Sequence, residues 1–273
     1  MRRRIMNIVP GRGGRILLAA VPFVLIVLFY IIASAARHAE NENDKILPPI
    51  SQMGEALHGV AFEPDKRTGH YLFWQDTASS LKRLGVGIGV ATLIGLVLGL
   101  IVGLIPVVNA TFAPLIAAFS MVPPMAILPI LFIVFGLGEL SKVVLIVIGV
   151  APYLVRDLAM TVGSLPREQL VKAQSLGAST WQTLLRIALP QAMPRLFDSL
   201  RLSICPAFLF LISAEAISAE DGLGYRIFLV RRYLAMDTIL PYVIWIALLA
   251  YLMDFALARG ARRLFPWAYE RGT

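Results

Sequence analysis

The longest run of the chain without a charged residue covers residues 84–138, and it limits what this sequence can fold into. A bilayer core about 30 Å thick is crossed by about 20 helical residues. These 55 residues are too many for one spanning helix and suit two, with a break expected at residues 105–111. Only 15% of the chain is charged, against about 25% in an average soluble domain. The sequence therefore predicts an all-α membrane protein.

Four more apolar runs are long enough to span a bilayer. They cover residues 16–36, 140–162, 196–217 and 238–258. Together with the two helices expected within residues 84–138, they predict six transmembrane helices. The first run could also be a cleavable signal peptide, since Ala33-Ser34-Ala35 resembles a cleavage site. Because the run is long for a signal peptide, we interpret residues 16–36 as a retained first helix.

The charged residues outside these runs predict an orientation. Residues 1–15 hold five arginines and no acid, and residues 156–201 hold six basic and three acidic residues, so both suit the cytoplasmic face. Residues 37–81 hold seven acidic and four basic residues and suit the extracytoplasmic face. We predict a multi-pass protein of the cell (inner) membrane with both termini in the cytoplasm. Its predicted parts are the N-terminal segment 1–15, the first helix, the extracytoplasmic segment 37–81, a core of residues 82–262 and the C-terminal segment 263–273.

The sequence lacks the signals of several other classes of protein. No lysine follows a glycine, so there is no phosphate-binding P-loop. The histidines His38, His58 and His70 have no metal-ligand spacing, and the single cysteine excludes a disulfide framework. We therefore predict no catalytic residue, no metal site and no cofactor in this chain. The net charge of +8 follows the predicted inner face without interleaved aromatic residues, which favours the lipid bilayer over nucleic acid as a partner.

Glycines and prolines within the apolar runs indicate close packing and an interrupted helix. Small residues four apart, at 85 and 89 and at 95, 99 and 103, let helix backbones approach closely in lipid. The helix expected at 112–135 contains prolines that free carbonyl groups, so it is either kinked for packing or lines a pathway.

Ionisable residues within spans tend to face the bundle interior. Glu215 is either such a pathway residue or a residue of the outer interface paired with Arg226. Asp198 and Asp254 are expected near the cytoplasmic ends of their helices, paired with nearby arginines. The candidate pathway residues are Met121, Pro123, Pro124, Met125, Ser203, Ser213 and Glu215.

The predicted cytoplasmic loop, residues 163–195, has the signals of two short helices. Ser164 is expected to cap a helix that begins at Pro166, and Gly177 either ends this helix or lets another surface approach. Residues 178–180 are expected to cap a second helix over residues 181–188, which stops before Pro190. The two helices form either a rigid knob that fits a cleft in a soluble partner or an interfacial pair on lipid.

The spacing in this loop resembles the signature E-A-A-x3-G-x9-I-x-L-P of permease subunits of ABC-type importers. Gly177, Ile187, Leu189 and Pro190 stand at its intervals and Ala173 at its second alanine. Val171 and Lys172 replace the glutamate and the first alanine. The resemblance implies a coupling helix that docks in a groove of an ATPase. The residues it implicates are Lys172, Ala173, Gln174, Gly177, Ala178, Ile187, Leu189 and Pro190.

Other segments are similar to the nitrate/sulfonate/taurine group of these permeases, namely residues 46–52, 79–83, 122–129, 135–142 and 214–225. The resemblance implies a type I ABC importer permease fold and a second permease subunit, most simply an identical one. It also implies a cytoplasmic ABC ATPase dimer that binds the ATP, and an extracytoplasmic substrate-binding protein. The expected solute is a small nitrogen- or sulfur-containing compound such as nitrate, a sulfonate or taurine. Alternatives are a urea- or guanidine-like solute, a secondary transporter driven by an ion gradient, a membrane enzyme and an exporting permease.

Overall fold

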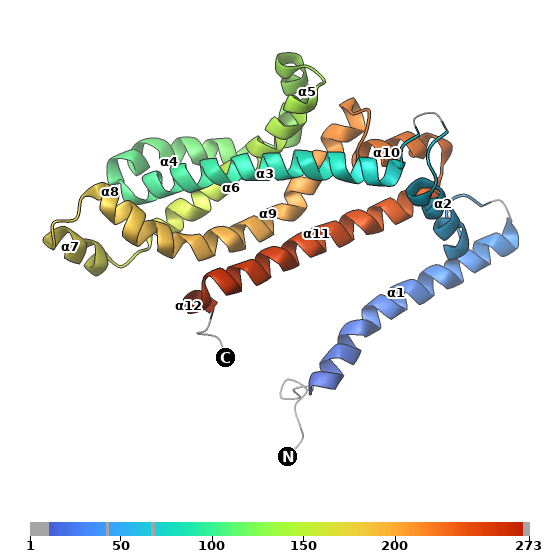
Figure 1. The fold of residues 1–273 in the computed structure, drawn as a ribbon, viewed down its shortest axis with the longest axis horizontal. Helices are drawn as coiled ribbons and strands as arrows, with labels where there is room; N and C mark the ends of the chain where they lie inside the picture. The colour runs from blue at the N-terminus through green and yellow to red at the C-terminus, as the bar shows by residue number, and fades with distance from the viewer. Residues whose placement is uncertain (1–10, 42–43, 67–68, 270–273) are drawn as a thin grey trace.

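The computed structural model describes residues 11–41, 44–66 and 69–269, and within them every regular element is a helix (Figure 1). The predicted terminal segments 1–15 and 263–273 therefore lie partly outside the described residues. The helices are α1 (Arg12–Glu40), α2 (Ile50–Phe62), α3 (Leu72–Leu104), α4 (Pro106–Met121), α5 (Pro124–Phe135), α6 (Glu139–Gly163), α7 (Arg167–Ser175), α8 (Thr180–Thr183), the π-helix η2 (Leu184–Ala188), α9 (Leu189–Ser218), α10 (Leu223–Val230), the 3-10 turn η3 (Arg231–Tyr233), α11 (Met236–Leu264) and α12 (Pro266–Tyr269).

Five helices are long and apolar enough to cross a membrane. They are Gly13–Glu40, Leu72–Leu104, Glu139–Gly163, Thr180–Ser218 and Met236–Leu264. The pair α4 and α5 adds a sixth crossing if the two are counted as one span, although they meet at 93°. The predicted all-α membrane fold is confirmed, and the predicted six crossings are present only with this bent pair included.

Helices α3 and α6 form the closest-packed pair of the fold, and small residues on α3 make this possible. A Cβ atom on Gly95 would lie 2.6 Å from that of Leu154, and one on Gly103 would lie 2.7 Å from that of Val162. Only glycine fits at such distances, so the prediction of close backbone approach is confirmed for these positions. Because the contacts follow the same order along both helices, α3 and α6 run parallel.

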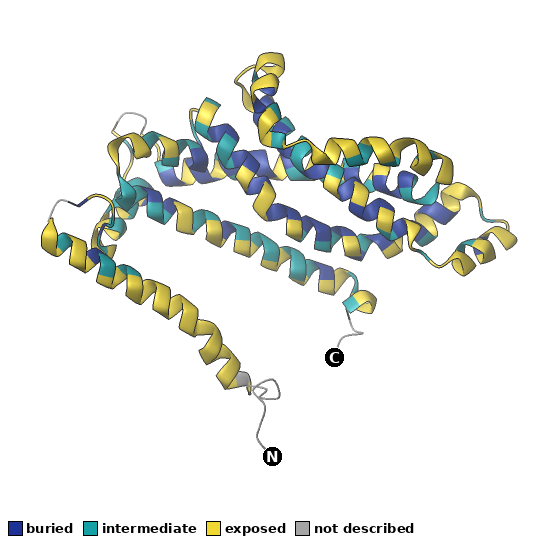
Figure 2. Cartoon of the chain, turned by 180° about the vertical axis from the view of Figure 1, so that it is seen from behind, coloured by how far each residue is buried: buried dark blue, intermediate teal, exposed yellow. Residues whose placement is uncertain are grey.

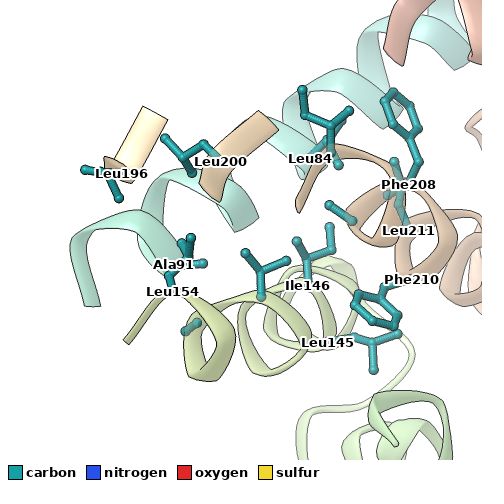
Figure 3. Packing of buried hydrophobic residues seen from close by; sticks show 14 of the residues in the cluster. Leu84, Ala91, Leu145, Ile146, Leu154, Leu196, Leu200, Phe208, Phe210 and Leu211 are labelled. Atoms are coloured by element: carbon teal, nitrogen blue, oxygen red, sulfur yellow. The ribbon is translucent and has the colours of Figure 1, made fainter. Parts of the chain in front are cut away.

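The same prediction is wrong for Gly85 and Gly89. Both are exposed, and a Cβ atom on either would meet nothing within 4 Å, because their face of α3 turns away from α6. The packed face carries the apolar core of the molecule, where side chains of α3, α6 and α9 interlock (Figure 3). Leu84, Ile146 and Leu211 are fully buried in this core.

The region predicted as one span over residues 112–135 is instead two helices at an angle. Helix α4 begins at Pro106, directly after the single residue Ile105, and ends at Met121. Val122 and Pro123 each precede a proline and are both extended, at ψ of 121° and 118°. A residue before proline is disfavoured in the helical conformation. Two such residues in succession therefore turn the chain by 93° rather than kink a continuous helix.

The polar segment predicted at residues 37–81 is more helical than expected. It holds α2, and its last ten residues already belong to α3, which begins at Leu72. Helix α1 lies apart from the rest of the bundle in Figures 1 and 2, and its most apolar stretch is 0% buried. The end of α1 is held to the following loop by Tyr30, whose hydroxyl donates to the Pro48 carbonyl at 2.6 Å.

Candidate functional site

The predicted coupling loop forms a protruding elbow, which we define as residues 164–190. It lies at the end of the bundle, beyond the close of α6, and most of its surface is exposed (Figures 1 and 2). Helix α7 begins at Arg167, directly after Pro166, with Glu168 in its first turn. The predicted cap at Ser164 is wrong, because Ser164 ends α6 and its hydroxyl donates to the Thr161 carbonyl at 2.7 Å.

Gly177 ends α7 in a Schellman motif. Its φ of +79° lies in the left-handed region, where a Cβ atom is strained. The Ala178 N–H donates to the Ala173 carbonyl at 3.0 Å, and the Gly177 N–H donates to the Gln174 carbonyl at 2.9 Å. This geometry explains the spacing of the signature, because an alanine four residues before the glycine packs at the closing turn. The prediction that Gly177 ends the first helix is confirmed.

The second short helix begins with a reciprocal cap. The Gln182 N–H donates to Ser179 Oγ at 3.2 Å, and the Ser179 N–H donates to Gln182 Oε1 at 2.9 Å. This capping box satisfies two backbone groups that a helix start leaves open. It also fixes the angle at which the chain leaves Gly177. The predicted cap within residues 178–180 is therefore confirmed at Ser179.

The predicted stop before Pro190 is wrong, since helical structure continues from Thr180 to Ser218. A proline lacks the N–H that would bond the carbonyl of residue 186 in an α-helix. The turn Leu184–Ala188 is a π-helix instead, closed by the Leu189 N–H donating to the Leu184 carbonyl. The wider turn accommodates Pro190 near the start of α9. The elbow is thus joined to the span α9 without a flexible break.

The signature residues divide into an inward and an outward set. Ala173 is buried, and Ile187, Leu189 and Ala178 are partly buried, so these four form the inner support of the elbow. Lys172, Gln174, Gly177 and Pro190 are exposed. The outward face also presents apolar side chains: Leu176 is 79% exposed, Trp181 64% and Val171 58%. A tip that exposes apolar side chains and has no side chain at Gly177 is suited to binding in a groove of another protein.

Polar contacts anchor the elbow to the spans. The Gln191 amide donates to Gln169 Oε1 at 3.0 Å, which ties α7 to the start of α9. Arg195 on α9 donates two hydrogen bonds to Asp157 on α6, at 2.8 and 2.6 Å, and Ser199 donates to the same carboxylate. Asp157 is only 6% exposed. The helices before and after the elbow are therefore cross-linked at its base.

A cluster of charges around the buried Arg83 occupies the other end of the same helices. We call it the Arg83 cluster; its members are Arg83, Glu139, Lys142, Glu215 and Asp221. Arg83 donates to Glu215 at 2.7 Å, to Glu139 at 2.5 and 2.9 Å, and to Asp221 at 2.5 Å. It joins α3 to the start of α6, to α9 and to the loop before α10. Lys142 donates to Glu139 at 2.8 Å.

Glu215 is enclosed near the end of α9, and the structure contradicts one part of what was predicted for it. It is 0% exposed, and besides Arg83 it accepts hydrogen bonds from Ser80 at 2.8 Å and the Gly224 N–H at 2.9 Å. The predicted pairing with Arg226 is wrong, because Arg226 donates to Asp76 at 2.7 Å. Glu215 therefore holds helices together and does not line an open channel in this conformation.

Sequence reasoning missed Asp76, Ser80 and Arg83 because charged residues were treated as the boundary of the span. Asp76 is 0% exposed, accepts from Arg226 and from the Tyr242 hydroxyl at 3.2 Å, and so links α3 to α10 and α11. The available signal was spacing. Asp76, Ser80 and Arg83 stand four and seven residues along one helix and share one face.

The other pathway candidates fall into two groups. Met121, Pro123, Pro124 and Met125 lie at the corner between α4 and α5, and Met121 is 77% exposed. The α9 serines use their hydroxyls within their own helix: Ser203 donates to the Ser199 carbonyl and Ser213 to the Leu209 carbonyl, both at 2.8 Å. Neither serine offers a free donor to a solute in this conformation.

The acids predicted near the cytoplasmic ends of the helices are paired as expected. Arg201 donates to Asp254 at 2.8 and 3.1 Å, and its guanidinium lies 3.8 Å from Asp198. Asp198 also accepts a hydrogen bond from the Tyr269 hydroxyl at 3.0 Å. The prediction of structural pairing with arginine is confirmed.

Comparison with known proteins identifies the family to which this chain is similar. The family described as binding-protein-dependent transport system inner membrane component matches residues 91–266. The taurine transport system permease protein TauC of Escherichia coli K12 is 36% identical over 225 residues, which cover 82% of this chain and 81% of TauC. The bicarbonate transport system permease protein CmpB of Synechococcus elongatus is 32% identical over 67% of this chain and 66% of its own length.

A solved structure shares the fold. The chain superposes on a chain of the MetNI methionine ABC transporter in an inward-facing conformation with a TM-score of 0.63 and 20% identity. The match covers 73% of this chain and 99% of that one. It confirms the predicted fold.

Proposed function

The chain belongs to the family of binding-protein-dependent transport system inner membrane components, and from that premise we propose that its elbow couples solute import to a separate cytoplasmic ATPase. As a member of this family it is the multi-pass permease component of an ABC importer. An ion-gradient-driven secondary transporter and a membrane enzyme are set aside by this membership.

The observation that carries the proposal is the construction of the elbow. The Schellman motif at Gly177, the capping box at Ser179 and the uninterrupted run into α9 make it stiff. Its tip exposes Leu176 and Trp181, which suit a protein groove. A movement of the tip is then transmitted to α9 directly, and to α6 through the bonds between Arg195 and Asp157.

The proposed orientation places the elbow and both chain ends in the cytoplasm and the Arg83 cluster at the outer face. The predicted partners follow from this arrangement. An ABC ATPase dimer docks at the elbow and itself binds and hydrolyses the ATP. This chain therefore needs no cofactor of its own. An extracytoplasmic binding protein delivers the solute, and a second copy of this chain completes the pathway. The exposed corner residues Met121 and Met125 are the proposed pathway residues that such a second copy would face.

We propose a small sulfonate such as taurine as the solute. The support is the 36% identity to a taurine permease, which extends over 82% of this chain. Nitrate and bicarbonate are the competing solutes, because related permeases carry those names. The test measures uptake of labelled taurine in the presence of the cognate binding protein, with nitrate, bicarbonate or urea added as a competitor. The strength of inhibition by each competitor ranks the candidate solutes. Uptake competed by urea alone would contradict the proposed sulfonate.

The coupling proposal is tested by Gly177→Arg. We expect ATP-dependent uptake in vesicles to be abolished while the chain still inserts, because the side chain grows from the exposed tip, where a Cβ atom meets nothing within 4 Å. The backbone strain of a left-handed non-glycine residue costs only about 1–2 kcal/mol.

Gly69→Arg is the matched control. Gly69 also has a positive φ, +70°, and also faces open space, but it lies in the segment before α3 at the other end of the molecule. The control should insert and transport normally. Normal uptake by Gly177→Arg, or equal loss in both variants, would contradict the coupling role.

A further inference from the structure

A cavity of about 480 Å³ lies between α9 and α11, at the end of the bundle that carries the C-terminus, and belongs to neither site described above. Four arginines line it, Arg201 from α9 and Arg259, Arg262 and Arg263 from the last turns of α11. Among the described residues that line it, the only carboxylate is that of Asp254, which already accepts two hydrogen bonds from Arg201. The volume lies within the range of about 300–1,000 Å³ that is typical of ligand pockets.

Three of these four arginines have no carboxylate partner within the described part of the chain. Arg259, Arg262 and Arg263 are exposed, and none of them forms an ion pair with a carboxylate of the residues that the structure describes. The helix dipole favours cations in the last turn of α11. It does not account for Arg259, one turn earlier, or for Arg201 on the neighbouring helix. The excess positive charge at one cavity therefore indicates an anionic ligand.

Two further residues that line the cavity are aromatic and lie earlier on α11. Tyr251 is 63% exposed and Phe255 is 51% exposed, and their rings stack with centroids 6.4 Å apart. Both lie in the apolar part of the spanning helix Met236–Leu264, one to two turns before the arginines. Trp267, 59% exposed, lies just beyond the arginines, as expected of a residue at a membrane–water interface. A soluble protein could reach the arginines, but hydrocarbon chains are the natural neighbours of Tyr251 and Phe255.

From this juxtaposition we propose that the cavity between α9 and α11 binds the headgroup of an anionic phospholipid. The phosphate bonds Arg262 and Arg263, whose planar guanidinium groups match phosphate oxygens. The acyl chains run along Tyr251 and Phe255. Basic pockets between spanning helices at the cytoplasmic face are known to suit such headgroups. The bound lipid would fix the end of α11 beside α9.

The test compares two adjacent arginine pairs at opposite ends of the molecule. Arg262→Gln with Arg263→Gln removes charge from the cavity. Arg231→Gln with Arg232→Gln removes the same charge from η3, far along α11, and leaves the cavity intact. The purified full chain is equilibrated with mixed micelles of phosphatidylglycerol and phosphatidylcholine, and the lipid retained after gel filtration is counted by mass spectrometry.

We expect the wild type and the Arg231/Arg232 variant to retain phosphatidylglycerol in preference to phosphatidylcholine. The Arg262/Arg263 variant should lose about 25-fold in this preference, since each arginine near an anionic lipid contributes about fivefold. Helix content measured by circular dichroism checks that both variants fold.

Three results would overturn the proposal. They are equal retention of the two lipids by the wild type, an unchanged preference in the Arg262/Arg263 variant, and displacement of the phosphatidylglycerol by millimolar inorganic phosphate. The third would assign the cavity to a soluble phosphate compound. Because the measurement needs neither uptake nor the elbow, it is independent of the coupling proposal.

Discussion

Removing the guanidinium of Arg83 is the most informative perturbation of this fold. The side chain of Arg83 is 6% exposed and binds three carboxylates. Two of the three can be rehydrated when it is lost, because Glu139 is 63% and Asp221 30% exposed at the side chain. Glu215 is 0% exposed and would keep only the Ser80 hydroxyl and the Gly224 N–H as donors. Arg83→Met therefore leaves one fully buried, uncompensated charge.

The magnitude follows from that single charge. Removing one partner of a buried ion pair costs about 3–5 kcal/mol. Glu215→Gln leaves Arg83 with two of its three carboxylates and loses one charged hydrogen bond, so it should cost about 1.5–3 kcal/mol. In the double variant Arg83→Met with Glu215→Gln no buried charge remains without a partner. Its loss should therefore be smaller than the sum of the single losses by about 0.5–3 kcal/mol.

Thermal unfolding in detergent, followed by tryptophan fluorescence, measures these changes. Two tryptophans report on this end of the bundle: Trp74 and Trp245 pack edge to face at 5.9 Å, and Trp245 donates to Thr77 at 3.1 Å. For a chain of this size 1 kcal/mol shifts Tm by about 2–4 °C. Arg83→Met should therefore lower Tm by about 6–20 °C.

Asp221→Asn is the control, because Asp221 binds the same arginine from a partly exposed position, 30% at the side chain, and its loss leaves no buried charge without a partner. We expect it to cost about 1 kcal/mol or less. Glu139→Gln is unsuitable, since the side chain of Lys142, 3% exposed, pairs with Glu139. The reasoning fails if Arg83→Met and Asp221→Asn lower Tm equally, since exposure would then have no bearing on the cost. It also fails if the double variant is as destabilised as the sum of its single changes.

Two other predictions test packing and charge elsewhere. Gly99→Leu should prevent α3 and α6 from packing together and abolish stable folding, because a Cβ atom there would lie 2.7 Å from that of Leu158. Gly89→Leu is the control, since a Cβ atom at Gly89 meets nothing within 4 Å, and its Tm should stay within about 1 °C of the wild type. Hydrogen bonds from Arg37 hold the pKa of the Asp44 carboxyl below its usual value of about 3.9. This link between α1 and the following loop is therefore fully present above about pH 4 and lost as the pH falls through the lowered pKa. Asp44→Asn should lower Tm at pH 7, and its effect should shrink progressively as the pH is lowered below 4.

The elbow could be predicted from the sequence because its signals are local. Ser179, Gly177 and the proline before α7 each act within a few residues, and the structure gives the cap, the left-handed turn and the helix start at those positions. The predictions at Ser164 and Pro190 are wrong because a local signal can have more than one structural outcome. A serine between two helices can serve the end of one or the start of the next, and a proline ends a helix only where no wider turn absorbs it.

The buried charges could not be predicted from hydropathy. An average over a window treats Asp76 and Arg83 as the end of an apolar run. In the structure both are buried, and their partners Arg226 and Glu215 lie more than a hundred residues later. Only the folded arrangement of α3, α9 and α10 brings these groups together. Their shared helical face was visible in the sequence, but the identity of the partners was not.

The positions of these two polar clusters decide how α6 and α9 can move. At the elbow end Arg195 joins α9 to Asp157 of α6, and at the far end Arg83 joins Glu215 of α9 to Glu139 of α6. Between them the ring of Phe210 lies so close over Gly149 that a Cβ atom there would be 2.2 Å away. Two helices fixed at both ends and packed without a gap in the middle cannot slide past one another without breaking buried charge contacts. A displacement of the elbow must therefore tilt α6 and α9 together, with α3 carried along by Arg83, so that motion at one end of the molecule is delivered to the opposite end as the rotation of one body.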